Sequence, residues 1–137
     1  MTENKQTISL RSSPDQLTAV DDAVERWLRK QDVPEDTIMD LALAVSELVN
    51  NAIEHGNERD PEKKFIVVLC SRQGEIEISV TDEGHGFDPD DLPDPLDDEN
   101  LLKPSGRGLF IIKSLVDQIQ FSFSPGGGTT VIVTKKI

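Results

Sequence analysis

Cysteine is almost absent from this sequence, since Cys70 is the only one in 137 residues. A single thiol forms no intramolecular disulfide, so we expect Cys70 to be a small buried strand residue in a protein of the reducing cytoplasm. Long apolar runs are also missing: nowhere do eighteen apolar residues follow one another, and we expect no membrane span. The N-terminal stretch has an early acidic residue and no apolar segment, so we expect no secretory signal.

Positive charge is scarce as well. Fourteen Lys and Arg residues stand against 26 Asp and Glu residues, which gives a net charge of −12 at pH 7. That charge repels a phosphate backbone and argues against direct binding to nucleic acid. The negative charge fits either a basic protein partner or a surface whose charge only keeps the protein soluble, and the composition does not distinguish between these two explanations.

The length suits one domain over residues 1–137, long enough to bury a core without disulfides or a structural metal. Weak alternation over residues 7–11 predicts a short first strand. Ser13, Pro14 and Gln16 then supply the N-cap, the first-position proline and the capping-box partner of a helix. Its predicted apolar face consists of Leu17, Val20, Val24, Trp27 and Leu28.

A second helix is predicted from near Pro34 to Gly56, with acidic residues in its first turn where the helix dipole favours them. Spacing the residues at 100° gives one apolar arc of Ile38, Leu41, Val45, Leu48, Val49 and Ala52. The opposite arc holds Glu47, Asn50, Asn51 and Glu54. Because a purely solvated face would more often use better helix formers than Asn, this arc is a candidate site.

The second half of the chain reads as strands, a loop and one more helix. Residues 65–70 and 75–81 predict a hairpin in which Ile76, Ile78 and Val80 face a covered side. The acidic stretch 88–99 has no periodicity and predicts a loop. A helix of about three turns is expected after Gly106, followed by strands over 118–123 and 129–135.

Three features indicate chemistry. Glu47 and Asn51 lie four apart on one helix, so an amide oxygen for Mg²⁺ and a carboxylate base would point the same way. Asp82 ends a strand, where it would accept from an exocyclic amine or cap a turn. Gly106 and Gly108 at a helix start would expose backbone N–H groups to an anion. Each feature alone also has a plain structural explanation.

The order and spacing of these features carry a resemblance to a known family. The segments Glu47 to Ala52, Asp82 to Phe87, Gly106 to Leu109 and Gly128 to Thr130 resemble the four boxes of the ATP-binding fold shared by gyrase, Hsp90, histidine kinases and MutL. Within that superfamily the short form looks like the bacterial anti-sigma factor and serine kinase family. The resemblance implies an α+β two-layer sandwich of the Bergerat type, with a mixed, largely antiparallel sheet and helices on one face.

The resemblance also implies roles for single residues. Glu47 would be the general base that acts on the attacking hydroxyl, and Asn51 would be the Mg²⁺ ligand. Asp82 would accept from the adenine N6 amine and select adenine over guanine, because guanine offers a carbonyl at that position.

The remaining nucleotide contacts are implied in the same way. Residues 88–105 correspond to an ATP lid, and Thr130 or Thr129 would support the adenine pocket. The implied ATP- or ADP-binding residues in the glycine boxes are Gly84, Gly86, Phe87, Gly106, Arg107, Gly108 and Leu109.

Two functions of different class remain. The first is an anti-sigma factor that uses ATP and Mg²⁺ to phosphorylate a serine of an anti-anti-sigma (STAS-type) antagonist and that sequesters a sigma factor, acting as a homodimer. The second is an ATP-dependent protein-binding module without significant kinase activity. A detached ATPase domain of a histidine kinase is a further alternative, although no helix pair with a phosphoacceptor His precedes the boxes.

Overall fold

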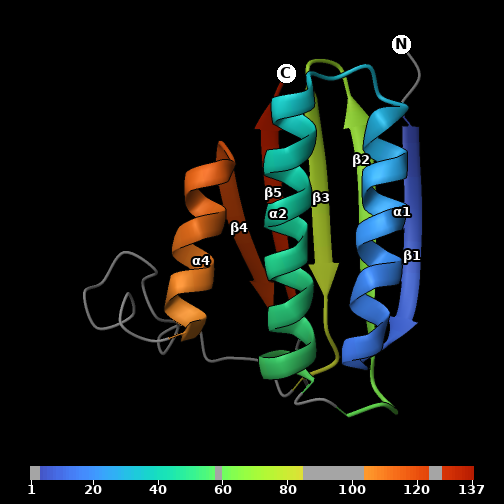
Figure 1. Cartoon of the computed structure of the whole chain (residues 1–137). Helices are drawn as coiled ribbons and strands as arrows, with labels where there is room; N and C mark the ends of the chain where they lie inside the picture. Colours follow the sequence, from blue (N-terminus) through green and yellow to red (C-terminus); the bar gives the residue numbers. More distant parts are fainter. Residues whose placement is uncertain (1–3, 58–59, 85–103, 124–127) are drawn as a thin grey trace.

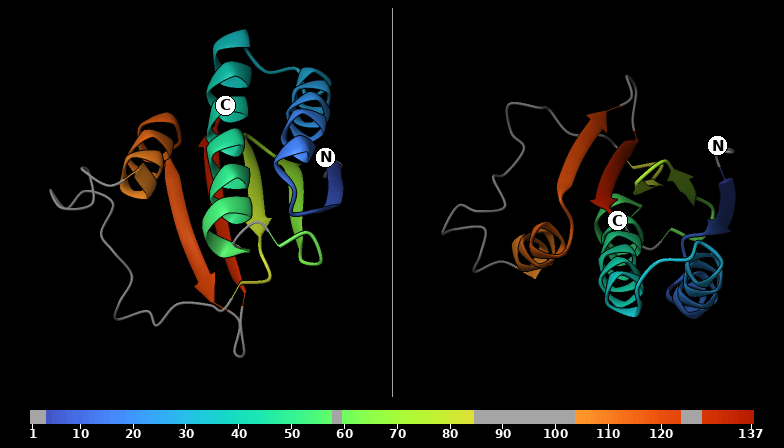
Figure 2. Two further views of the ribbon diagram at one scale, coloured as in Figure 1. Left: turned by 60° about the horizontal axis from the view of Figure 1, so that its bottom comes forward. Right: turned by 90° about the horizontal axis from the view of Figure 1, so that it is seen from above.

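The protein is built as two layers, a five-stranded sheet and a layer of helices that covers one face of it (Figures 1 and 2). This computed structural model describes residues 4–57, 60–84, 104–123 and 128–137. The α+β class predicted from the sequence is confirmed. Among the described helices, none is long and apolar enough to cross a membrane.

The sheet has the strand order β1-β2-β3-β5-β4. Each neighbouring pair among the described strands is antiparallel, so the expectation of a mixed sheet is wrong in that detail. The order places β5 between β3 and β4, because the last strand returns beside the hairpin. The strands are β1 (Asn4–Arg11), β2 (Lys64–Arg72), β3 (Glu75–Thr81), β4 (Gln118–Phe123) and β5 (Thr129–Lys136).

Three α-helices of the described residues form the second layer. Helix α1 (Leu17–Arg29) follows a short 3₁₀ turn, η1 (Pro14–Gln16). Helix α2 (Glu35–Asn51) continues without a break into a π-helical turn, η2 (Ala52–Gly56), so the predicted end at Gly56 is confirmed. Helix α4 (Pro104–Leu115) begins two residues before the predicted start at Gly106.

The predicted capping box at the first helix is wrong. The Ser13 side chain caps no backbone N–H, and its hydroxyl instead donates to the carboxylate of Asp15. The backbone N–H of Gln16 reaches the Ser13 carbonyl at 2.9 Å, which closes a 3₁₀ turn rather than an α-helical one. A separate short turn therefore precedes α1.

The core lies between the two layers, where the apolar faces of the helices pack on the apolar side chains that alternate along the strands. Trp27 is 4% exposed and is a core residue, as predicted. Helix α2 lies between α1 and α4 and contacts both (Figure 1). The side chains with no exposed surface include Leu28, Leu41, Val45, Val49, Phe65, Val67, Leu69, Ile76, Ile78 and Val133.

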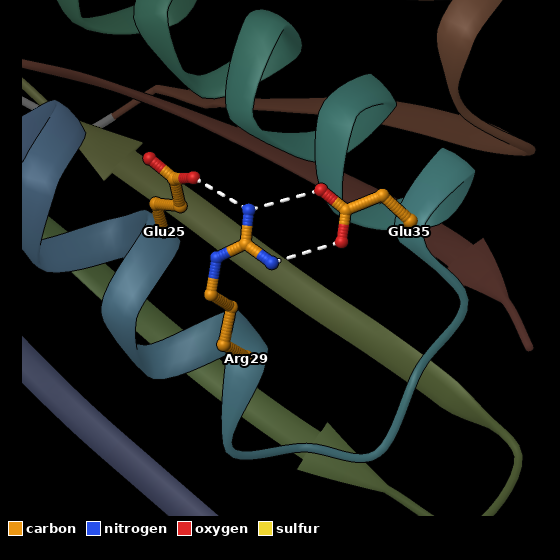
Figure 3. A network of polar contacts seen from close by, with 3 residues as sticks. All are labelled: Glu25, Arg29 and Glu35. Atoms are coloured by element: carbon orange, nitrogen blue, oxygen red, sulfur yellow. Dashed lines mark hydrogen bonds and ion pairs between the residues drawn. The ribbon is translucent and has the colours of Figure 1, made fainter.

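A charged cluster joins the end of α1 to the start of α2 (Figure 3). The Arg29 guanidinium donates to both carboxylate oxygens of Glu35, at 2.8 and 2.9 Å, and to Glu25 at 2.8 Å. These hydrogen bonds, those of Glu35 first, raise the pKa of Arg29, and the same contact lowers the pKa of Glu35. All three side chains are exposed, so solvent screens the cluster and its main effect is on the geometry of the connection.

Four helix and strand ends that bear on the predicted site lie at one end of the sandwich. Helix α2 and strand β3 both end there, while β5 and α4 both begin there (Figure 1). The segments predicted to bind nucleotide flank these four points. We call this end of the molecule the site end.

Candidate functional site

Asp82 directly follows β3 at the site end and is held by the backbone of its own turn and of the start of β5. Its Oδ1 accepts the N–H of Gly84 at 2.9 Å and the N–H of Thr129 at 3.1 Å. Its own N–H donates to the Thr129 carbonyl at 2.9 Å. Within the described residues, both hydrogen bonds that the carboxylate accepts go to the same oxygen. The carboxylate therefore has a fixed orientation in the absence of a ligand.

The environment of Asp82 acts on its pKa in two directions. Burial has the largest effect and raises the pKa, since a carboxylate loses hydration there. The hydrogen bonds from Gly84 and Thr129 and the charge of Lys63 lower it, and the net result is a raised pKa. The combination of burial, backbone hydrogen bonds and a nearby positive charge makes Asp82 a candidate functional residue.

The two threonines at the start of β5 point to opposite faces of the sheet. The Thr130 hydroxyl shares a hydrogen bond of 2.8 Å with the Thr81 hydroxyl. The backbone of Thr129 pairs with Asp82, and the Thr129 side chain is 5% exposed. Its Oγ1 is buried without a hydrogen-bond partner among the described residues. The structure thus brings Thr129 to Asp82 and places the Thr130 hydroxyl on Thr81.

Two glycines allow the end of α2 to approach Asp82. A Cβ atom on Gly56 would lie 2.1 Å from Asp82 Oδ2, and one on Gly84 would lie 2.2 Å from the Gly56 carbonyl oxygen. Both distances are far below van der Waals contact, so neither position has room for a side chain. The end of η2 and the turn after β3 are therefore packed backbone against backbone.

Glu47 and Asn51 lie one turn apart near the end of α2, and both side chains are half-buried. The helix continues through η2 to Gly56, which lies against Asp82. The two predicted sets therefore share the site end. Among the described residues no cluster of three or more His, Cys, Asp or Glu side chains is able to hold a metal.

Several predicted site residues belong to the second glycine box. Its backbone lies in the first two turns of α4, at the site end. Gly86, Phe87 and lid residues 88–103 lie outside the described residues, and the last two lid residues open α4. The box consists of Gly106, Arg107, Gly108 and Leu109.

Sequence reasoning missed two residues that build the site. Gly56 was expected only to end a helix, and Asn57 was given no role. Asn57 has no exposed surface, and its Oδ1 accepts the N–H of Glu83 at 2.7 Å. A polar residue directly after a helix-ending glycine is the one local signal, and it is too common to point to a site.

Comparison with known proteins places these features in context. The sequence pattern of a family described as histidine kinase-like ATPase domain matches residues 10–135. The chain is 33% identical over 117 residues to an anti-sigma F factor of Oceanobacillus iheyensis, covering 84% of this chain and 80% of that one. An anti-sigma F factor of Clostridium beijerinckii is 28% identical over 138 residues, covering 99% and 96% of the two chains.

Solved structures share the fold at lower identity. The RsbU and RsbW domains of Rv1364c from Mycobacterium tuberculosis match with a TM-score of 0.67 and 23% identity, over 97% of this chain and 32% of that one. The mycobacterial sensor histidine kinase MprB matches with a TM-score of 0.60 and 18% identity, over 98% of this chain and 100% of that one. This chain thus spans about a third of the first structure.

Proposed function

Since this chain belongs to the family of histidine kinase-like ATPase domains, and among them to the anti-sigma F factors, we propose that it is an ATP-binding anti-sigma factor that phosphorylates a serine of an antagonist protein. Membership of an ATPase family implies nucleotide binding. The choice of nucleotide, the metal, the phosphotransfer and the partners are the parts that we propose.

The observation that carries the proposal is the fixed carboxylate of Asp82 beside the hydroxyl of Thr129, which has no hydrogen-bond partner among the described residues. An exocyclic amine donates to a carboxylate, whereas the carbonyl of guanine would be repelled by it. A buried hydroxyl without a partner costs free energy unless a ligand or water supplies one, and a ring nitrogen or a bound water fits that need. The residues present therefore fit an adenine base, with Thr129 rather than Thr130 beside Asp82.

The phosphates would lie between α2 and the start of α4. The first turn of an α-helix has backbone N–H groups without a partner inside the helix and the positive end of the helix dipole, and at the start of α4 both would favour an anion. Arg107 in that first part of the helix adds a cation in an otherwise acidic chain. The Asn51 amide oxygen would hold Mg²⁺, which neutralises charge on the transferred phosphoryl group when bound.

Glu47 supports a kinase rather than a passive binding module. In the proposed step its carboxylate takes the proton of the serine hydroxyl, and the serine oxygen forms a bond to the γ-phosphorus. The bond from that phosphorus to the bridging oxygen breaks, and the electron pair leaves with ADP. A module that uses ATP only to set its shape would have no need of a carboxylate one turn before Asn51.

The partners follow from the relatives. Their name, anti-sigma F factor, points to a sigma factor as one partner, and we propose a small anti-anti-sigma protein of the STAS type as the phosphate acceptor. We likewise propose a cytoplasmic homodimer. The net charge of −12 favours protein partners with basic surfaces and disfavours direct binding to nucleic acid.

The first test is thermal unfolding with Mg-ATP and with Mg-GTP, on the parent and on Asp82→Asn. Ligand at 100 times its dissociation constant adds about 2.7 kcal/mol, which for this size is a shift on the order of 10 °C. We expect the shift with ATP only, and we expect Asp82→Asn to lose it. Equal shifts with both nucleotides would contradict the assigned pocket, and no shift at millimolar ATP would contradict nucleotide binding.

The second test is transfer of labelled γ-phosphate to an antagonist protein recovered from the native cell by pull-down. Glu47→Ala should slow the transfer by about 10²- to 10⁴-fold, the usual contribution of a general base, and leave Mg-ATP binding intact. Asp36→Ala, an exposed acid on the same helix, is the matched control and should transfer at the parent rate. Equal rates for the Glu47 and Asp36 variants would favour the binding module.

A further inference from the structure

A buried side-chain amide lies behind the site, at Asn57. Its Nδ2 donates to the Ser12 hydroxyl and to the Lys64 carbonyl, the latter at 2.9 Å. Its Oδ1 accepts the N–H of Glu83 at 2.7 Å. Ser12 and Asn57 have no exposed surface. The three hydrogen bonds join residues that are 45, 7 and 26 positions apart in the sequence, which is further than one helical turn. One amide therefore links three separate segments.

The link to Glu83 is the one that bears on the site. Glu83 lies between Asp82 and Gly84, so a hydrogen bond to its backbone N–H fixes the turn that carries the Asp82 carboxylate. The Glu83 side chain strengthens the same turn, because its Oε2 accepts the N–H of Lys64 at 2.9 Å. Lys64 also provides the carbonyl that Asn57 binds, so the amide and the turn share one strand end as a common support.

Close packing acts together with this hydrogen bond. Gly56, the residue before Asn57, lies against the Asp82 carboxylate and against Gly84 with no room for a Cβ atom. Gly56 and Asn57 thus hold residues 82–84 at two points, one by contact and one by a hydrogen bond. Because η2 continues α2 directly, the same two residues connect that turn to Glu47 and Asn51.

We propose that Asn57 is a positioning residue, which sets the preference for adenine by holding the Asp82–Gly84 turn at the end of α2. The proposal rests on the nucleotide function proposed above. In that function Asp82 selects the base, while Glu47 and Asn51 serve the phosphates. The base-binding turn and the phosphate-binding end of α2 act on one nucleotide only when the distance between them is constant. The Asn57 side chain provides a hydrogen bond that keeps this distance constant.

The test compares the parent with three variants. Asn57→Ala removes the acceptor for Glu83, and Asn57→Leu removes it while keeping the branched shape and the number of heavy atoms, so that a cavity is not the cause of any effect. Ser12→Ala is the matched control, because it takes a buried partner from the same amide but leaves the bond to Glu83. Two readouts are measured at 10 °C on samples shown to be folded by circular dichroism.

The first readout needs no nucleotide. Amide hydrogen exchange at Glu83 and Gly84 should accelerate by about tenfold or more in both Asn57 variants and stay near the parent rate in Ser12→Ala. The second readout is the ratio of the dissociation constants for Mg-GTP and Mg-ATP. That ratio should fall by about tenfold in the Asn57 variants and remain unchanged in Ser12→Ala, which a merely structural role would not produce.

The outcomes separate this proposal from the one on which it rests. Unchanged exchange at Glu83 and Gly84 in the Asn57 variants would overturn the positioning role, whether or not the protein binds ATP. Accelerated exchange with an unchanged nucleotide ratio would overturn the role in base preference. A parent that binds neither nucleotide would overturn the proposed function and the role in base preference together, and the exchange rates would then judge the positioning alone.

Discussion

At the scale of single residues, the surroundings of Asp82 affect both the stability of the fold and the proposed binding of a ligand. Its burial disfavours the ionised form, while two backbone N–H groups and Lys63 favour it. Burial has the larger effect, so in the absence of ligand the folded protein holds this proton more tightly than the unfolded chain does. A ligand amine that donates to the carboxylate would offset part of that cost.

The pH dependence of stability tests this balance. A raised folded pKa contributes stability that is fully present below the ordinary value of 3.8 and is lost as the pH rises through the folded pKa. Asp82→Asn has no proton to lose there. Its free energy of unfolding minus that of the parent should therefore increase as the pH rises through this window, measured by urea unfolding without nucleotide. A difference that stays constant with pH would contradict a raised pKa.

At the scale of elements, α2 has two functions along its length. Its buried stripe packs on the sheet and against α1 and α4, and its last turns carry the proposed phosphate residues. Every side chain of the stripe that anchors the helix also helps to place Glu47 and Asn51. The cluster of Arg29 with Glu25 and Glu35 fixes the opposite end of the helix (Figure 3).

A matched pair of substitutions on α2 tests the anchoring role. Leu41 has no exposed surface, and Met39, two residues earlier, is 62% exposed. Leu41→Ala should lower the free energy of unfolding by about 2–5 kcal/mol, because it removes buried methyl groups and leaves a cavity. Met39→Ala should change it by no more than about 0.5 kcal/mol. Urea unfolding monitored at Trp27 measures both, and similar losses would mean that Met39 is covered in solution.

At the scale of the whole molecule, charge is the dominant feature. The net charge of −12 is spread over a protein of 137 residues, so acidic side chains repel one another across the surface. The described helices cover one face of the sheet (Figure 2), and the described core lies between the two layers.

Salt should for this reason stabilise the protein. Raising sodium chloride from about 20 to about 200 mM shortens the screening length to less than about 10 Å, and it weakens the repulsion more than it weakens the exposed ion pairs of the described residues. The midpoint of urea unfolding should increase over that range, measured without nucleotide. A decrease would indicate that pairs such as Arg29 with Glu35 contribute more than the net repulsion does.

Local pattern in the sequence determined most of the elements and the family. Helical spacing predicted α1 and α2, alternation predicted the hairpin of β2 and β3, and the resemblance to the anti-sigma and serine kinase family is confirmed. The pairing of Glu47 with Asn51 also follows from the sequence, since residues four apart on a helix share a face. These features depend on neighbours within about one or two turns, so the order of residues alone carries them.

Only the tertiary structure decided which residues surround Asp82. Alternation places Thr129 and Thr130 on opposite faces, but the pairing of β3 with β5 decides that Thr129 meets the carboxylate. The contact of Gly56 with Asp82 and the bond from Glu83 to Asn57 join residues 26 apart in sequence. No local period encodes such contacts, because they form only when the end of α2 and the end of β3 pack against each other in the folded chain.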